Sequence, residues 1–147
     1  MMSGTIAAQN TEEIAELATQ ISSYTRSITY WQGQEGAADS RAFDLRRVKQ
    51  GLTNGISPLA GIFTPIRTYH TVNTWEGNAA TASRERLDIH EEVLGGARRN
   101  IEALIDDLQD ELVITEGEAD WAGNRVSHYR SLRWAAEEEK RDLQRLY

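Results

Sequence analysis

The sequence predicts an all-α protein, an antiparallel helical bundle of about four to five helices with a long central helix. Apolar residues recur at alternating intervals of three and four positions in two long stretches, which is the a/d pattern of packed helices. No segment shows the strict apolar–polar alternation of a half-buried strand. Only two of the 147 residues are proline, so few positions oppose a helix.

Composition excludes several classes of function. The net charge of −7 argues against nonspecific binding to nucleic acid or to an anionic membrane. The chain has no cysteine, so it has no disulfide, thiol nucleophile or thiolate metal site. No stretch approaches the roughly 20 apolar residues of a transmembrane helix. We therefore expect no membrane span and no direct specific readout of nucleic acid.

The N-terminal ten residues are expected to form a flexible tail that precedes a single helical domain over residues 11–147. This segment has no basic residue and no long apolar core, so it does not resemble a Sec-type signal peptide. The sequence leaves the location open, either export without such a signal or incorporation into a virion or other assembly.

The first helix is expected to begin at Asn10 or Thr11, either of which can cap it. Its seam has spacings of 3, 4, 3, 4 and 3 over Ile14, Leu17, Ile21, Tyr24, Ile28 and Trp31. We expect Gly33 to end this helix, with Gly36 preventing a restart. A second helix is expected from Asp39 or Ser40 to the stop signal Asn54-Gly55.

The segment from Gln50 to Ile66 contains no charged residue, and it carries the apolar side chains of Leu59, Ile62 and Phe63. Two interpretations are open. The segment is either a buried connection between helices or an exposed contact used in oligomerisation or in docking a partner. A helix is expected to follow from about Pro65 to Thr74.

The longest helix is expected to begin at Asn78. Its predicted seam again alternates by three and four, over Leu87, His90, Leu94, Ala97, Ile101, Leu104 and Leu108, and Ile105 and Leu112 are expected to widen the apolar stripe. Glu116-Gly117-Glu118 is expected to break this helix. A last helix, capped by Asp120, would then run to the C-terminus.

One triplet, Trp-x-Gly, occurs three times at intervals of 44 and 46 positions. Glycine allows the chain to leave a helix through a positive φ, and tryptophan can cover exposed helix ends. The triplets are therefore predicted to be corners between helices. A degenerate repeat and a chance recurrence both remain open. The residues concerned are Trp31, Gly33, Trp75, Gly77, Trp121 and Gly123.

No pattern in the sequence indicates catalysis. The histidines form no His-x-x-x-His or Glu-x-x-His pair, and His90 is interpreted as a packed core residue of the long helix. The serines lack a nucleophile-elbow context, and Gly95-Gly96 alone is not a phosphate-binding loop. We expect no enzyme activity, no cofactor and no metal.

The stretch Thr74-Trp75-Glu76-Gly77-Asn78-Ala79-Ala80-Thr81-Ala82 resembles the turn of the Trp-x-Gly family, which are small helical hairpins exported by type VII secretion systems. In that family, small alanines follow the triplet and lead into a long amphipathic helix. The resemblance extends over roughly Pro58 to Leu112. It implies that Trp75 and Gly77 form a hairpin turn and that the seams dimerise with a related partner.

The alternative hypothesis is a structural component of a virion (a head, neck or tail protein) or of another multisubunit assembly. The family often has a large aromatic residue after the alanines, and this chain has Ser83 there. The family's export signal, a Tyr followed four residues later by an acid, is also absent, since Arg133 follows Tyr129 at that spacing. Both hypotheses predict an interaction protein whose partner is itself or another helical protein, in a homo- or hetero-oligomer.

Overall fold

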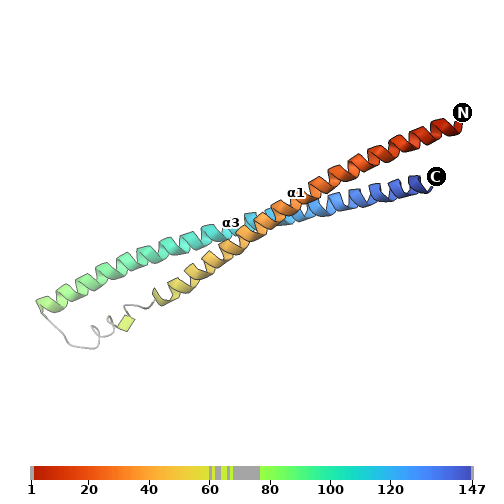
Figure 1. Cartoon of the computed structure of the whole chain (residues 1–147). Coiled ribbons are helices and arrows are strands. Elements are labelled where there is room, and N and C mark those ends of the chain that lie inside the picture. Colours follow the sequence, from red (N-terminus) through yellow and green to blue (C-terminus); the bar gives the residue numbers. More distant parts are fainter. Residues whose placement is uncertain (1, 60, 62–63, 66, 68–76, 147) are drawn as a thin grey trace. The chain divides into compact units, whose positions relative to one another are not determined.

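The structure, a computed structural model, describes residues 2–59, 61, 64–65, 67 and 77–146. Two long helices contain nearly all of these residues: α1, Met2–Leu59, and α3, Asn78–Arg145 (Figure 1). The described residues contain no strand, so the all-α prediction is confirmed. The predicted bundle of four to five helices is wrong, because the same residues form only two long helices.

Helix α1 does not stop where glycine led us to expect. Gly33, Gly36 and Gly55 all lie inside it on exposed positions, where an added Cβ would meet nothing within 4 Å. A glycine inside a helix costs about 0.5–1 kcal/mol relative to alanine, which continued burial of a seam can outweigh. The 3/4 spacing indeed continues without a break, over Ile28, Trp31, Glu35, Ala38, Ala42, Leu45, Lys49, Leu52, Ile56 and Leu59.

The helices near the two ends of the chain also differ from those expected. Helix α1 begins at Met2, so the expected tail over residues 1–10 is helical from Met2 onward. Glu116, Gly117 and Asp120 lie within α3, so the break and the separate last helix are wrong. Of the expected helix from Pro65 to Thr74, the structure describes only Pro65 and Arg67, both helical. The single domain expected over residues 11–147 stays a prediction.

The predicted seam of the long helix is right in four of its seven members. Leu87 is buried, and Leu94, Ile101 and Leu108 are half-buried. The other three members are wrong, because the inner face carries Glu91 and, as expected, Ile105 and Leu112. His90, Ala97 and Leu104 are exposed, so His90 is not a core residue. The two sets have the same 3/4 spacing, and only the position of α1 decides between them.

The beginning of α3 matches its prediction. Gly77 has φ of 103° and is the only described residue with a positive φ. Its carbonyl accepts hydrogen bonds from the backbone N–H and the hydroxyl of Thr81, at 3.0 and 3.1 Å. Gly77 therefore provides the left-handed backbone from which α3 starts at Asn78.

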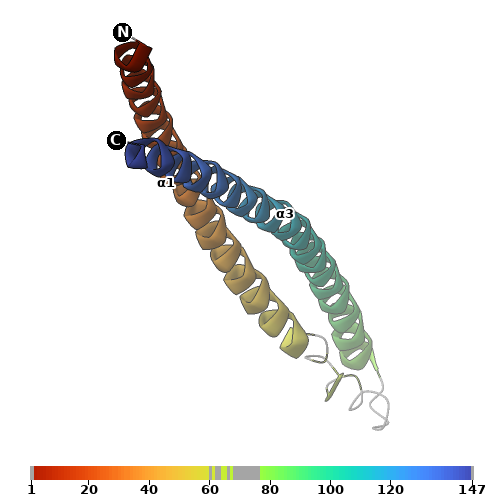
Figure 2. The same cartoon turned by 90° about the vertical axis from the view of Figure 1, so that its right-hand side faces the viewer.

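Contacts divide the chain into two compact units, and in each of them a segment of α1 runs antiparallel to a segment of α3 (Figures 1 and 2). Unit 1 comprises Met1–Arg41 and Ile114–Tyr147, and unit 2 comprises Ala42–Val113. The most buried residues of unit 1 are mainly small, and small side chains allow two helix backbones to approach closely. They include Ala38, Thr115, Ala119 and Ala122, beside Leu17, Ile28, Val126 and Ala136. In unit 2 the buried residues are Ala42, Ala80, Leu87 and Leu112.

Replacing Gly33 by alanine is expected to raise the free energy of unfolding by about 0.5–1 kcal/mol, because Gly33 lies in a helix with open space around its Cα. The matched change Gly77→Ala is expected to lower it by about 1 kcal/mol or more, since alanine is strained at positive φ. Chemical denaturation followed by circular dichroism measures both. If Gly33→Ala instead lowered the free energy of unfolding, that result would contradict a helical Gly33 and support the corner predicted from the sequence.

Enlarging Ala38 to leucine is expected to lower the free energy of unfolding by about 1–3 kcal/mol, because Ala38 is 1% exposed and extra methylenes would force the paired helices apart. Ala37→Leu is the control, since Ala37 is the exposed neighbour on the same helix. Equal stability of the two variants in denaturation experiments would show that the helices are not closely packed at Ala38.

Candidate functional site

Unit 1 contains a cluster of aromatic rings between α1 and α3. The rings of Trp31 and Trp121 meet edge to face, with centroids 4.7 Å apart and an interplanar angle of 85°. Tyr30 packs edge-on against Trp31 at 5.0 Å. About two turns before Trp31 on α1, the ring of Tyr24 lies near that of Tyr129 of α3, with centroids 6.2 Å apart. Edge-to-face pairs of this kind stabilise contacts beyond the area that they bury.

Arg125 provides the positive charge at the centre of this cluster. Its guanidinium carbon lies 5.2 to 5.8 Å from the ring centroids of Tyr129, Trp121 and Trp31, which is cation–π range. Its Nη2 donates a hydrogen bond to the Tyr129 hydroxyl at 3.1 Å. Its Nε is buried and has no hydrogen-bond partner within the described residues. The rings of both helices thus hold Arg125 in place.

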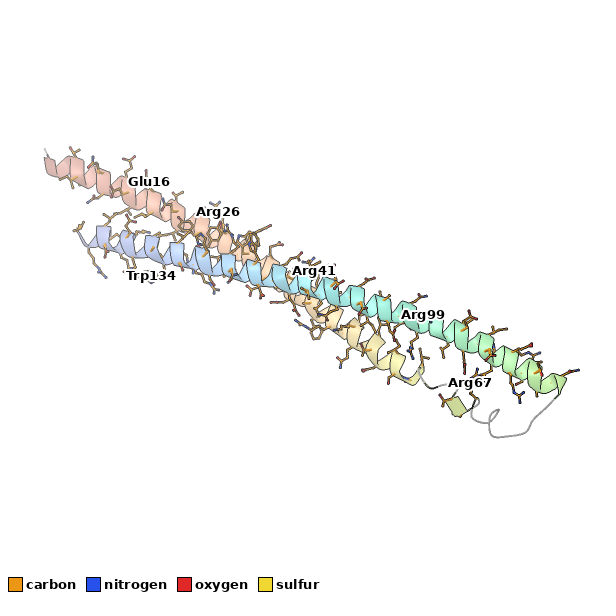
Figure 3. The ribbon with its side chains drawn as sticks, turned by 180° about the vertical axis from the view of Figure 1, so that it is seen from behind. Glu16, Arg26, Arg41, Arg67, Arg99 and Trp134 are labelled. Atoms are coloured by element: carbon orange, nitrogen blue, oxygen red, sulfur yellow. The ribbon has the colours of Figure 1, made fainter. Side chains whose placement is uncertain are left out.

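A groove of about 430 Å³ opens beside the tryptophan pair, within unit 1. Its walls include the two rings together with Gln34, Ala38 and Ile114. Arg41, labelled on α1 in Figure 3, also lines the groove, and its Nη2 donates a hydrogen bond to Glu118 of α3 at 2.8 Å. Both side chains are more than half exposed, so solvent screens this ion pair.

Three residues of α3 that line this groove, Ile114, Glu118 and Trp121, begin a second 3/4 pattern. We call this pattern the outer seam: Ile114, Glu118, Trp121, Arg125, His128 and Leu132. Each member immediately precedes an inward residue of unit 1: Thr115, Ala119, Ala122, Val126, Tyr129 and Arg133. Ile114 and Trp121 are 56% and 54% exposed although both are large and apolar. A second seam of this kind is typical of a helix that packs against more than one neighbour.

Unit 2 is held at two other points by polar contacts. Arg67 forms ion pairs with Asp88 and Glu91 of α3 at 2.5 and 2.7 Å, and it is labelled in Figure 3. The pKa of Arg67 is raised above its ordinary value, most by its hydrogen bonds to Glu91 and to a smaller extent by that to Asp88. Lys49, at an inward position of α1, donates a hydrogen bond through Nζ to the side chain of Gln109. These contacts fix position and offer no reacting group.

The structure brings two of the three predicted triplets together, but not as corners. Trp31 and Gly33 lie within α1, and Trp121 and Gly123 lie within α3, so the corner prediction is wrong for both. Burial of the seam along each helix outweighs the local tendency of glycine to end a helix, so α1 continues past Gly33 and α3 past Gly123. Gly77 lies at a helix start as predicted, and Leu59 is the half-buried last residue of α1. Trp75, Ile62 and Phe63 lie outside the described residues.

Sequence reasoning missed Glu35 and Arg125. Glu35 continues the spacing of the α1 seam, and its carboxylate would lie 3.4 Å from a Cβ added at Gly123. Gly123 therefore leaves room for a side chain of the opposite helix, which is a different role from a turn. The 3/4 spacing that continues across Gly33 already indicated an inward position for Glu35. The expectation that the helix ends at Gly33 left this position outside the seam.

The described residues lack a candidate metal site and a candidate membrane span. They contain no group of three or more His, Cys, Asp or Glu side chains that could hold a metal ion. No helix among them is long and apolar enough to cross a membrane. Comparison of the chain with models of known families, with curated proteins and with solved structures gives no match.

A double-mutant cycle on Trp31→Ala and Trp121→Ala is expected to give a coupling free energy of about 0.5–1.5 kcal/mol, because the two rings contact each other edge to face. Equilibrium denaturation of the two single variants and the double variant measures it. A cycle between Trp31 and Trp134 is the control, since Trp134 lies farther along α3 and is 63% exposed (Figure 3). Coupling that is equal in the two cycles would contradict the ring contact.

Proposed function

We propose that this chain is a non-enzymatic helical interaction and assembly protein that works by packing exposed apolar faces of its helices against another helical chain. The supporting observation is the distribution of large side chains. The described residues include no large side chain that is fully buried, whereas Phe43, Val93, Trp121 and Trp134 are all more than half exposed. Exposed apolar side chains at helical spacing mark contact surfaces rather than a finished core.

Within this class we favour a protein similar to the Trp-x-Gly helical hairpins of type VII secretion. Two features support the choice. The described chain consists of two long helices, and Gly77 of the central triplet precedes the second with a positive φ. A hairpin of this kind would pair with itself or with a related hairpin. The partner is helical, and the proposal needs no cofactor and no metal.

A structural component of a virion or of another multisubunit assembly is the second candidate. It is favoured by the absence of an acid four residues after Tyr129 or Tyr24, and by the spread of exposed apolar side chains over both units. An assembly of many copies would cover such surfaces on several sides.

Light scattering of the full chain over a concentration series, at two salt concentrations, tests the proposal. We expect a mass above that of the 16.6 kDa monomer, and little loss at high salt, because apolar contacts are not screened. A discrete dimer favours the secretion-type hairpin, and a closed ring or polymer favours the structural component. A monomer at every concentration, with no helical partner retained on the immobilised chain, would contradict the proposal.

A further inference from the structure

The outer seam of α3 is self-complementary when it is read in both directions. From its first residue to its last it runs apolar, acid, Trp, Arg, His, apolar. Its reverse therefore places the apolar ends opposite each other, Glu118 opposite His128, and Trp121 opposite Arg125. In antiparallel helix pairs the two kinds of seam position alternate across the contact in this manner. The three pairings bring together two apolar residues, an acid with an imidazole, and an aromatic ring with a cation.

The position of the outer seam suits a third helix. Successive residues of an α-helix are about 100° apart around its axis. Each outer-seam residue precedes an inward residue, so a helix seated on the outer seam would contact α3 at about that angle from α1. Neighbouring helices in a four-helix bundle surround each helix at comparable angles. The groove beside Trp31 and Trp121 lies on the same side of unit 1.

We propose that the occupant of the outer seam is the same seam of a second copy of this chain, packed antiparallel about a two-fold axis between Trp121 and Arg125. Ile114 of each copy then packs on Leu132 of the other, and Trp121 of each copy faces Arg125 of the other. This inference rests on the proposed function and adds the identity of the partner and the surface used.

Charge favours a second copy over other occupants. The chain carries a net charge of −7, so two copies repel each other unless they meet where charge is low. The outer seam contains one acid, Glu118, and one base, Arg125, and Arg41 of α1 forms an ion pair with Glu118, so this face carries no excess of negative charge. An isologous contact presents every residue of the patch twice, so the patch must be complementary to itself, as the reversed order of the outer seam is.

Paired cysteines test the register, because the natural chain has none. In the full chain carrying both Ile114→Cys and Leu132→Cys, the two thiols are about 27 Å apart along one helix and cannot bridge within it. We expect mild oxidation to give a disulfide-linked dimer on a non-reducing gel. Each single variant is expected to remain a monomer on that gel, because an antiparallel contact separates identical residues by the same distance.

The control pair is Val113→Cys with Ser131→Cys, at the same separation but one position off the seam, where both residues are exposed. It is expected to remain a monomer on the gel. A second matched set uses solution mass. Ile114→Asp should abolish the dimer, whereas Val113→Asp should preserve it, although the two parent residues are 56% and 59% exposed. Circular dichroism of both variants shows whether they stay helical.

The outcomes separate this inference from the proposed function. Efficient cross-linking of the single variant Ile114→Cys would show a parallel contact and overturn the antiparallel pairing. A dimeric mass for the natural chain with no cross-link in the seam pair, or with equal effects of the two aspartates, overturns the inference and leaves the proposed function standing. If the cysteines at positions 114 and 132 form a disulfide with a different helical protein and not with a second copy, that protein is the occupant of the outer seam. This result would overturn the proposed self-pairing.

Discussion

The structure depends on one constraint, which is the pairing of two heptad seams that run through α1 and α3 without interruption. Within unit 1 the buried residues of this contact include Ala38, Ala119 and Ala122, and small side chains of this kind enclose little apolar surface. Each residue buried in this way contributes modestly, and the stability of the pair must come from the number of layers. That number is also why single glycines on the outer faces do not end either helix.

A close contact between small residues has a consequence for the large ones. Trp31 and Trp121 flank the alanines, and their rings cover the edge of the contact without being enclosed by it. Arg125 then lies between rings from both helices, with its charge facing π surfaces and the Tyr129 hydroxyl. The result is an aromatic and cationic surface on one side of unit 1, held rigid by the helices below it. Rigid surfaces of this composition are typical of protein–protein contacts.

The proposed function is based on the same packing, in which small side chains are buried and many large apolar side chains are exposed. A two-helix contact that includes many alanines leaves isoleucine, valine and tryptophan side chains exposed, and the proposal assigns them to a contact with another helical chain. On the proposed function, the protein acts through the chain that it binds. Whether the finished object is a secreted pair or part of a larger particle depends on how many of the exposed faces are occupied. The outer seam of α3 is the face that we propose pairs with a second copy of the chain.

The sequence by itself determined the all-α class, because the 3/4 apolar spacing is a property of one chain segment and needs no partner to be recognised. It also determined the start of α3 after Gly77, since positive φ is a local requirement that glycine meets best. The tertiary structure alone decided how many helices there are. Gly33, Gly117 and Gly123 carry the same local signal as Gly77, and only burial of the seam against the opposite helix overrides it. The tertiary structure also decided which of two equivalent 3/4 registers faces inward, so that Glu91 lies on the inner face while His90 and Leu104 remain outside. The meeting of Trp31, Trp121 and Arg125 depends on the antiparallel register between residues about 90 positions apart, and no spacing within a single helix contains that information.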